Sequence, residues 1–309
     1  MTFRIFAVIP FITFPWATPF ESLQAILTKA NPPIRDESSP PRNVSRSRIA
    51  APDSSFEVIK WTEFNLETLM EAYGDILNEQ VQVKNHTPTQ LPSVRYLADL
   101  KTVAQAYVLP TLQYTTEAGA RHIGIRLERH LPAIDFRPSL RLPGDQTCYP
   151  TFALCSSNDK AHMVGCVQSA KQWHSSDLLG TSMTAKRPIG RLITCCNNAK
   201  TRYGFVFTSS EVVVIRLSTN ETARPFQVEW QAIPWGASGD NVLTVNLALW
   251  LLAMMSLNDD HRPICDSTEL IPLNSWSRSV GTDGQVVYQH HLSMRKRFDL
   301  PAGAVYTEA

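Results

Sequence analysis

The chain has 309 residues, of which 43% are hydrophobic and 18% are charged. This composition is typical of an ordinary globular protein with one large or two modest domains and a sizeable core. A formal net charge of +1, from 29 basic and 28 acidic residues, excludes the overall basic character that nucleic-acid-binding domains usually carry. Any contact with nucleic acid would therefore depend on a local basic surface.

Cysteine usage indicates the redox compartment. Six cysteines in 309 residues are too sparse for a disulfide scaffold, and Cys195 and Cys196 are adjacent, which is an awkward geometry for bridging each other. We therefore expect free thiols and an intracellular protein, located in the cytoplasm or the nucleus.

Residues 1–30 form an apolar N-terminal arm. After Arg4, residues 5–14 are almost entirely apolar and resemble the hydrophobic region of a signal peptide, although the stretch is too short to span a bilayer. Pro10 and Pro15 interrupt it and no clear cleavage site follows, which favours an arm that is buried or docked on a partner. Secretion is the alternative to an intracellular location, and we expect no integral membrane span.

The next segment differs in composition. Residues 31–55 are rich in Pro, Ser and Arg, and such a sequence buries too little apolar surface to offset the entropy of ordering. We expect a disordered linker there and a single globular domain over residues 56–309. The linker has a basic character that is typical of a solvated tail, with phosphate contact as the alternative, through Arg35, Arg42, Arg46 and Arg48.

Hydrophobic patterning predicts the elements of the domain. Apolar residues at helical spacing predict helices over residues 64–77, 94–108 and 116–130, followed by a short apolar run that ends near Asp135. Further along, the sequence predicts a buried strand, a helix and a strand pair, at residues 163–167, 187–198, 203–208 and 212–217. Residues 243–257 form an almost unbroken apolar helix, too short for a membrane span and expected in the core.

This order of elements, together with four sequence stretches, resembles a known family. The stretches consist mostly of packing residues and lie at 201–208, 211–216, 233–235 and 243–250. With them, the region from about residue 116 to residue 259 is similar to a fungal family of PD-(D/E)XK nuclease-like proteins. The resemblance implies an α/β (α+β) fold with a restriction-endonuclease-like core, in which a central mixed sheet of about four to five strands is flanked by helices, with an N-terminal helical extension.

The resemblance also implies where the catalytic residues would lie. In such a nuclease, an acid ending one strand and an acid-x-Lys on the next hold Mg²⁺, and the lysine acts on the nucleophile. Asp135 fits the first acid and would be the one metal ligand. The second motif resembles Gly-acid-x-Lys followed by Trp, and Gly165 and Trp173 match it. Cys166 then stands at the acid and Gln168 at the lysine; a thiol is a poor Mg²⁺ ligand and an amide carries no charge, so the catalytic motif is degenerate.

Further residues are candidates for the same site. A helical position that faces the site in the broader nuclease class falls on Arg191. Glu117 or Glu128 would supply a helical acid, although a solvated helix surface is the simpler interpretation of both. Lys171 is a candidate replacement for the missing lysine, but the strand period of two points it away from Gln168.

Other chemistry has weaker support from spacing. Four zinc-type residues occur in one segment without matching a common zinc pattern, namely Cys148, Cys155, His162 and Cys166. Cys166 as a nucleophile would need His162 on the same face of its strand, and a buried inert thiol is the alternative. The histidines and basic residues over 290–297 would form a solvated polar face or contact phosphate.

We therefore expect a catalytically degenerate PD-(D/E)XK nuclease-like protein that acts as a binding or regulatory module without metal-dependent phosphodiesterase activity. The alternatives are an enzyme with repurposed chemistry on the same scaffold, such as an accessory step in fungal secondary-metabolite biosynthesis, and an active Mg²⁺-dependent nuclease. Only the last would need a cofactor, Mg²⁺ at Asp135. The partner is expected to be nucleic acid, bound by a local basic surface, or a small molecule.

Overall fold

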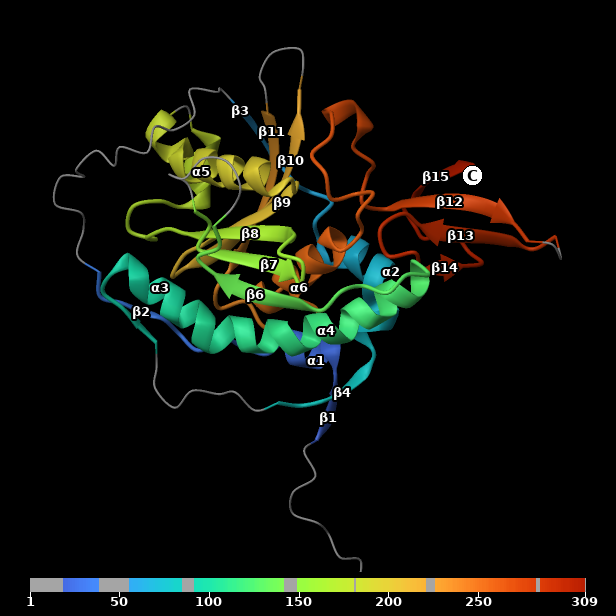
Figure 1. Ribbon diagram of the computed structural model, residues 1–309, viewed down its shortest axis with the longest axis horizontal. Coiled ribbons are helices and arrows are strands. Elements are labelled where there is room, and N and C mark those ends of the chain that lie inside the picture. Colours follow the sequence, from blue (N-terminus) through green and yellow to red (C-terminus); the bar gives the residue numbers. More distant parts are fainter. Residues whose placement is uncertain are drawn as a thin grey trace, which may run out of the picture.

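The computed structural model describes residues 19–38, 56–84, 92–141, 149–180, 182–220, 226–281 and 284–308. Within them, a seven-stranded mixed sheet forms the centre of the molecule and has helices on both faces (Figure 1). A separate four-stranded sheet lies at one end (Figure 1). The α+β class is therefore confirmed, and the prediction of four to five strands was too small.

The central sheet contains a meander followed by a parallel strand. Its members are β3 (Phe56–Lys60), β6 (Ile134–Pro138), β7 (Phe152–Ser156), β8 (Ala161–Val167), β9 (Tyr203–Phe207), β10 (Glu211–Thr219) and β11 (Phe226–Pro234). They lie in the order β3-β11-β10-β9-β8-β7-β6. β6, β7 and β8 are antiparallel to one another, whereas β9 is parallel to β8 and β3 is parallel to β11. The predicted strands β8, β9 and β10 are confirmed, and β7 and β11 were missed.

Two apolar layers enclose the sheet. On one face, helix α5 (Met183–Ala199) packs on a cluster that includes Val164, Cys166 and Val206. On the other face lie α4 (Leu109–Arg126) and α6 (Val245–Ser256), and α6 is buried along its whole length. α4 approaches α6 closely at Gly119, where a Cβ atom would lie 2.6 Å from a ring atom of Trp250. In the described part of the chain, every helix is too short or too polar to traverse a bilayer.

The helices before β6 differ from the prediction at one junction. α2 (Leu66–Leu77) lies where it was expected, and α3 (Leu97–Val103) continues through a π-helical turn, η1 (Ala104–Val108), directly into α4. The predicted break between residues 108 and 116 is therefore wrong. Pro110 lies two residues after the π-helical turn, and the wider backbone of this turn accommodates the proline ring and its missing N–H inside the continuous helix.

The chain before Phe56 also belongs to the compact domain. Its described elements and their partners are β1 (Phe20–Ser22), α1 (Leu23–Leu27), β2 (Arg35–Asp36), β4 (Gln80–Gln82) and β5 (Ser93–Val94). Leu23 and Leu27 are fully buried in the main core, so the compact region extends further towards the N-terminus than the predicted boundary at 56. Residues 1–18 and 39–55, which hold the apolar stretch and most of the predicted linker, lie outside the described residues.

The C-terminal sheet has the order β14-β13-β12-β15. Its strands are β12 (Ser275–Val280), β13 (Val286–His290), β14 (Lys296–Arg297) and β15 (Val305–Glu308), and two 3-10 turns precede it in the chain, η2 (Ser175–Leu179) and η3 (Ser267–Glu269). The prediction of a solvated or phosphate-binding cluster over 290–297 is wrong for His290, which is 1% exposed. Its neighbour Arg295 donates to the carbonyl oxygens of Met70 and Glu71, so this cluster joins the sheet to α2.

Candidate functional site

The degenerate motif lies at the corner of the central sheet where β8 ends and β7 begins, around Thr151 and Cys166. Phe152 pairs with Gly165, so the antiparallel register places Thr151 opposite Cys166. The Thr151 amide donates to the Gly165 carbonyl at 2.7 Å, and its hydroxyl accepts from the Val167 amide at 3.3 Å. The strand next to the motif is thus β7, and Thr151, which directly precedes it, lies opposite Cys166.

Packing explains the two residues that align the motif. A Cβ atom at Gly165 would overlap the ring of Phe205, which stacks on Phe152 with ring centroids 6.3 Å apart. Trp173 is fully buried under α5 and its indole N–H donates to the carbonyl of Ala185 at 2.6 Å. Both residues therefore have structural roles of their own, whatever the site does.

Gln168 and Arg191 reach the same corner of the sheet. The amide of Gln168 donates to the Phe207 carbonyl at 2.9 Å and extends the β8–β9 ladder by one residue. Strand periodicity puts the half-buried Gln168 side chain on the same face as Cys166, which is 3% exposed and packs against α5. From α5, Arg191 donates to the carbonyl of Tyr149 at 3.0 Å, two residues before Thr151.

Lys171 is directed to a different partner. Its ammonium group lies 3.7 Å from an oxygen of Asp36 and donates to the carbonyl of Ser38. Ser209, in the turn after β9, donates to the second oxygen of Asp36 at 2.6 Å. Burial acts to raise the pKa of Asp36, but hydrogen bonds from Ser209 and Ser38 and the charge of Lys171 outweigh it and hold the pKa below its usual value. This carboxylate is the one that the sequence analysis missed, since it stands in the predicted linker.

Asp135 does not belong to this corner. It lies on β6 and pairs with Cys155, which in turn pairs with Ala161 at the start of β8. Gln168 lies seven residues further along the chain than Ala161, a distance of about 23 Å at ~3.3 Å per residue. Arg137 holds the Asp135 carboxylate in place with its Nε 2.9 and 3.1 Å from the two oxygens. The structure therefore separates the predicted first acid from Cys166 and Gln168, because β7 lies between β6 and β8.

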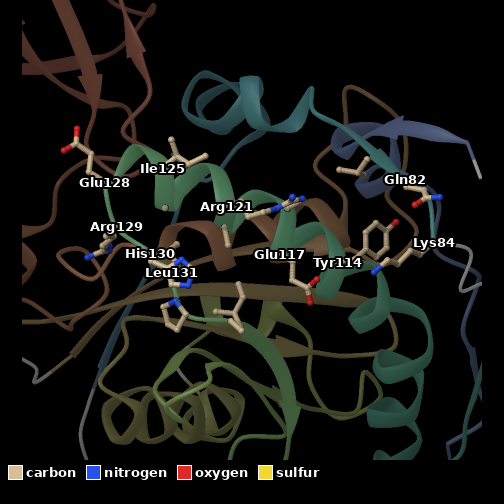
Figure 2. A pocket seen from close by; sticks show the side chains of 17 residues that line it. Gln82, Lys84, Tyr114, Glu117, Arg121, Ile125, Glu128, Arg129, His130 and Leu131 are labelled. Carbon is tan, nitrogen blue, oxygen red and sulfur yellow. The ribbon is translucent and has the colours of Figure 1, made fainter.

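Glu117 and Glu128 lie in a groove beside α4 with a volume of about 860 Å³. Figure 2 shows α4 side chains along its length, with Lys84 at one end and Glu128 at the other. Glu117 accepts a hydrogen bond of 2.7 Å from Gln113. The groove is lined mainly by apolar atoms and does not include Asp135, so it is not a pocket built around the predicted acid.

The described residues do not bring together the zinc-type ligands or the Cys166–His162 nucleophile and base that the sequence suggested. A β-bulge near the start of β8 puts Ala161 on the α5 side with Cys166, while His162 faces Ser256 and Arg262. His162 therefore cannot serve Cys166 as a base. Burial raises the pKa of the Cys155 thiol to about 11, which keeps it protonated and inert near neutral pH. Cys148 lies outside the described residues.

The Thr151–Cys166 corner therefore presents uncharged groups and the cation Arg191, while Lys171, three residues after Gln168, pairs with the Asp36 carboxylate. Among the residues that the structure describes, no three His, Cys, Asp or Glu side chains come together as metal ligands. Thr151, Cys166 and Gln168 supply a hydroxyl, a thiol and an amide, none of which carries the negative charge that a Mg²⁺ site requires. The guanidinium group of Arg191 gives this corner a cation that can attract a polar or anionic ligand. No protein-family model matches the chain, and no curated protein and no solved structure matches it either.

Proposed function

We propose that the protein is a catalytically degenerate member of the PD-(D/E)XK nuclease-like family and acts as a binding or regulatory module. The element order supports this proposal: helix α4, the antiparallel strands β6, β7 and β8, helix α5, and then β9 parallel to β8. A restriction-endonuclease-like core would place a helix, an antiparallel meander, a second helix and a further strand in this sequence.

One observation carries the proposal. An acid of one strand and an acid-x-Lys of the neighbouring strand must face each other to share a metal ion. The neighbour of β8 is β7, and the residue opposite Cys166 is Thr151, so the first-acid position passes from Asp135 to Thr151. Both acids and the lysine of the nuclease motif are then replaced by uncharged groups.

The protein would bind its partner, nucleic acid or a small molecule, without cleaving it. Arg191 lies at the corner and is always protonated, so it is the group there that would attract an anionic partner. With a net charge of only +1, the chain would hold nucleic acid weakly and locally. We also propose a location in the cytoplasm or the nucleus, because six cysteines in 309 residues are too sparse for a disulfide scaffold.

Cleavage assays test the loss of catalysis. The full chain is incubated with single- and double-stranded DNA and RNA in Mg²⁺ or Mn²⁺, and we expect no product above that of a no-protein control. Metal-dependent cleavage that is lost in Asp135→Asn or Asp36→Asn would overturn the proposal. Asp159→Asn is the matched control, because Asp159 is an exposed acid outside the corner that also pairs with Arg137.

Binding assays test the second part of the proposal, that the protein is a binding module. If the corner holds nucleic acid, Arg191→Gln weakens binding and reduces its dependence on salt by about one counterion, as expected for loss of one phosphate contact. Lys200→Gln is the control, since Lys200 is an exposed cation at the far end of α5. Equal affinities for the two variants would show that any binding does not use the corner.

A further inference from the structure

The groove beside α4 leaves apolar side chains uncovered. Ile125 is 74% exposed, the largest fraction among the bulky apolar side chains that the structure describes. Val81, Tyr114 and Leu131 line the same groove. From Tyr114 to Ile125 the groove follows about 17 Å of α4 at 1.5 Å per residue, and it continues to Glu128 beyond the helix end, which suits an elongated occupant. Uncovered apolar side chains in a hollow of this length are typical of a binding surface.

The chain itself enters at one end of this groove. β1 pairs with β4 in the antiparallel register Phe20↔Gln82, and the Val83 amide donates to the Pro19 carbonyl at 3.0 Å. The residues before Pro19 therefore begin beside Val83 and Lys84, and Lys84 itself lines the groove (Figure 2). Eighteen positions, residues 1–18, precede this point. They reach about 60 Å at ~3.3 Å per residue, well beyond the length of the groove.

The composition of that segment matches the groove. Residues 5–14 are apolar except for Pro10 and Thr13, and Arg4 is the one charged residue among positions 1–18. The groove offers mainly apolar walls, and its charged residues are of both signs, Glu117 and Glu128 beside Lys84, Arg121 and Arg129. The apolar surface, and not a net charge, is therefore what an apolar segment would recognise there.

We propose that residues 1–18 bind in the groove beside α4 of their own chain and cover Ile125. This inference does not rest on the proposed function, since the groove is separate from the Thr151–Cys166 corner. The segment would occupy an elongated apolar surface that adjoins its entry point, and displacing it would free the groove for another apolar segment.

Photo-cross-linking in the full chain tests the proposal directly. A benzoylphenylalanine residue is placed at position 125 or, as a matched control, at Leu179, which is 73% exposed on η2. We expect position 125 to cross-link to peptides from residues 1–18 within a chain of monomeric mass, and position 179 to give no such product. Cross-links between two copies, equal yields from the two positions, or no cross-link from position 125 to the segment would each overturn the proposal.

Hydrogen exchange gives a second test that does not depend on the cross-linker. In the full chain, Ile125→Glu should make the amides of residues 5–14 exchange roughly tenfold faster, because a charge replaces the apolar contact, whereas Leu179→Glu should leave them unchanged. Circular dichroism checks that both variants fold. Equal exchange in the two variants refutes the proposal, as does binding of the full chain to phosphatidylcholine vesicles through residues 1–18 while the groove stays unprotected.

Discussion

His290 gives the stability of the protein a dependence on pH that can be calculated. Burial is the main cause that lowers the pKa of the ring from about 6.5 to about 4; the hydrogen bond to the Leu273 carbonyl raises it, and the charges of His261, Arg295 and Arg126 lower it. In the neutral ring, Nε2–H donates to the Leu273 carbonyl at 2.7 Å and Nδ1 accepts from the Ser293 amide at 3.1 Å. A proton on Nδ1 would point at the Ser293 amide N–H, and the hydrogen bond between that amide and Nδ1 would be lost.

The sign and size of this effect on the free energy of unfolding follow from the linkage between proton binding and folding. The folded-state pKa lies below the unfolded value of about 6.5, so the unfolded chain binds the proton first and stability is lost as pH falls from 6.5 towards 4. For a shift to about 4, His290 alone removes about 1.8 kcal/mol between pH 7 and pH 5, and about 3 kcal/mol by pH 4. His162, with a pKa lowered to about 4 by burial, adds to the same loss.

Urea unfolding at pH 7 and pH 5 measures the contribution. His290→Gln removes the titrating ring, so the variant starts less stable at pH 7 but should lose about 1.8 kcal/mol less than the wild-type protein between the two pH values. His130→Gln, at an exposed position, is the matched control for the replacement of a histidine by glutamine. A His290→Gln variant with the same pH slope as the wild-type protein would show that the buried ring is not the group that responds.

Three further predictions concern packing, capping and thiol chemistry. Gly165→Ala should lower the free energy of unfolding in chemical denaturation by about 2 to 3 kcal/mol, because the new methyl group overlaps an aromatic ring. Gly236→Ala, with open space around the new atom, should lower it little, and equal losses would contradict the packing argument. Thr244→Ala should lower the free energy of unfolding by about 1 to 2 kcal/mol, since it removes the α6 cap and a buried bond to α1, and an unchanged denaturation midpoint would refute this. In the folded protein at pH 8, iodoacetamide should modify the half-buried Cys265 and spare Cys155, whose pKa burial raises to about 11; mass spectrometry that finds Cys155 modified first would contradict it.

Periodicity located the regular elements but not their neighbours in the sheet. The apolar pattern over 64–77 and the apolar run over 243–257 correspond to α2 and α6, because burial on a helix repeats with the helix itself. β7 was missed, although Phe152–Ser156 is a short apolar run that follows Pro150, a pattern typical of a buried strand. That one omission put Asp135 beside β8 and hid Thr151, since inserting a strand moves every residue of β6 away from β8.

Contacts over long sequence distances account for the other differences. Residues 31–38 have the composition of a linker, but Asp36 is held by Ser209 and by Lys171. Likewise, the Leu27 carbonyl at the end of α1 accepts a hydrogen bond of 2.6 Å from Thr244. Composition in a local window contains no information about partners more than a hundred residues away, so such segments become ordered without any local pattern that predicts it.

The complete burial of α6 has a consequence for how the chain folds during its synthesis. α1, α4 and strands β8, β9 and β10 all contact this helix, and each is made before it. Until residue 256 has left the ribosome, the apolar faces of these elements have no helix to pack against. The growing chain therefore exposes an aggregation-prone apolar surface for most of its translation. We therefore expect a nascent chain from which residues 244–256 have not yet emerged to be held by chaperones, and one from which residue 256 has emerged to be released.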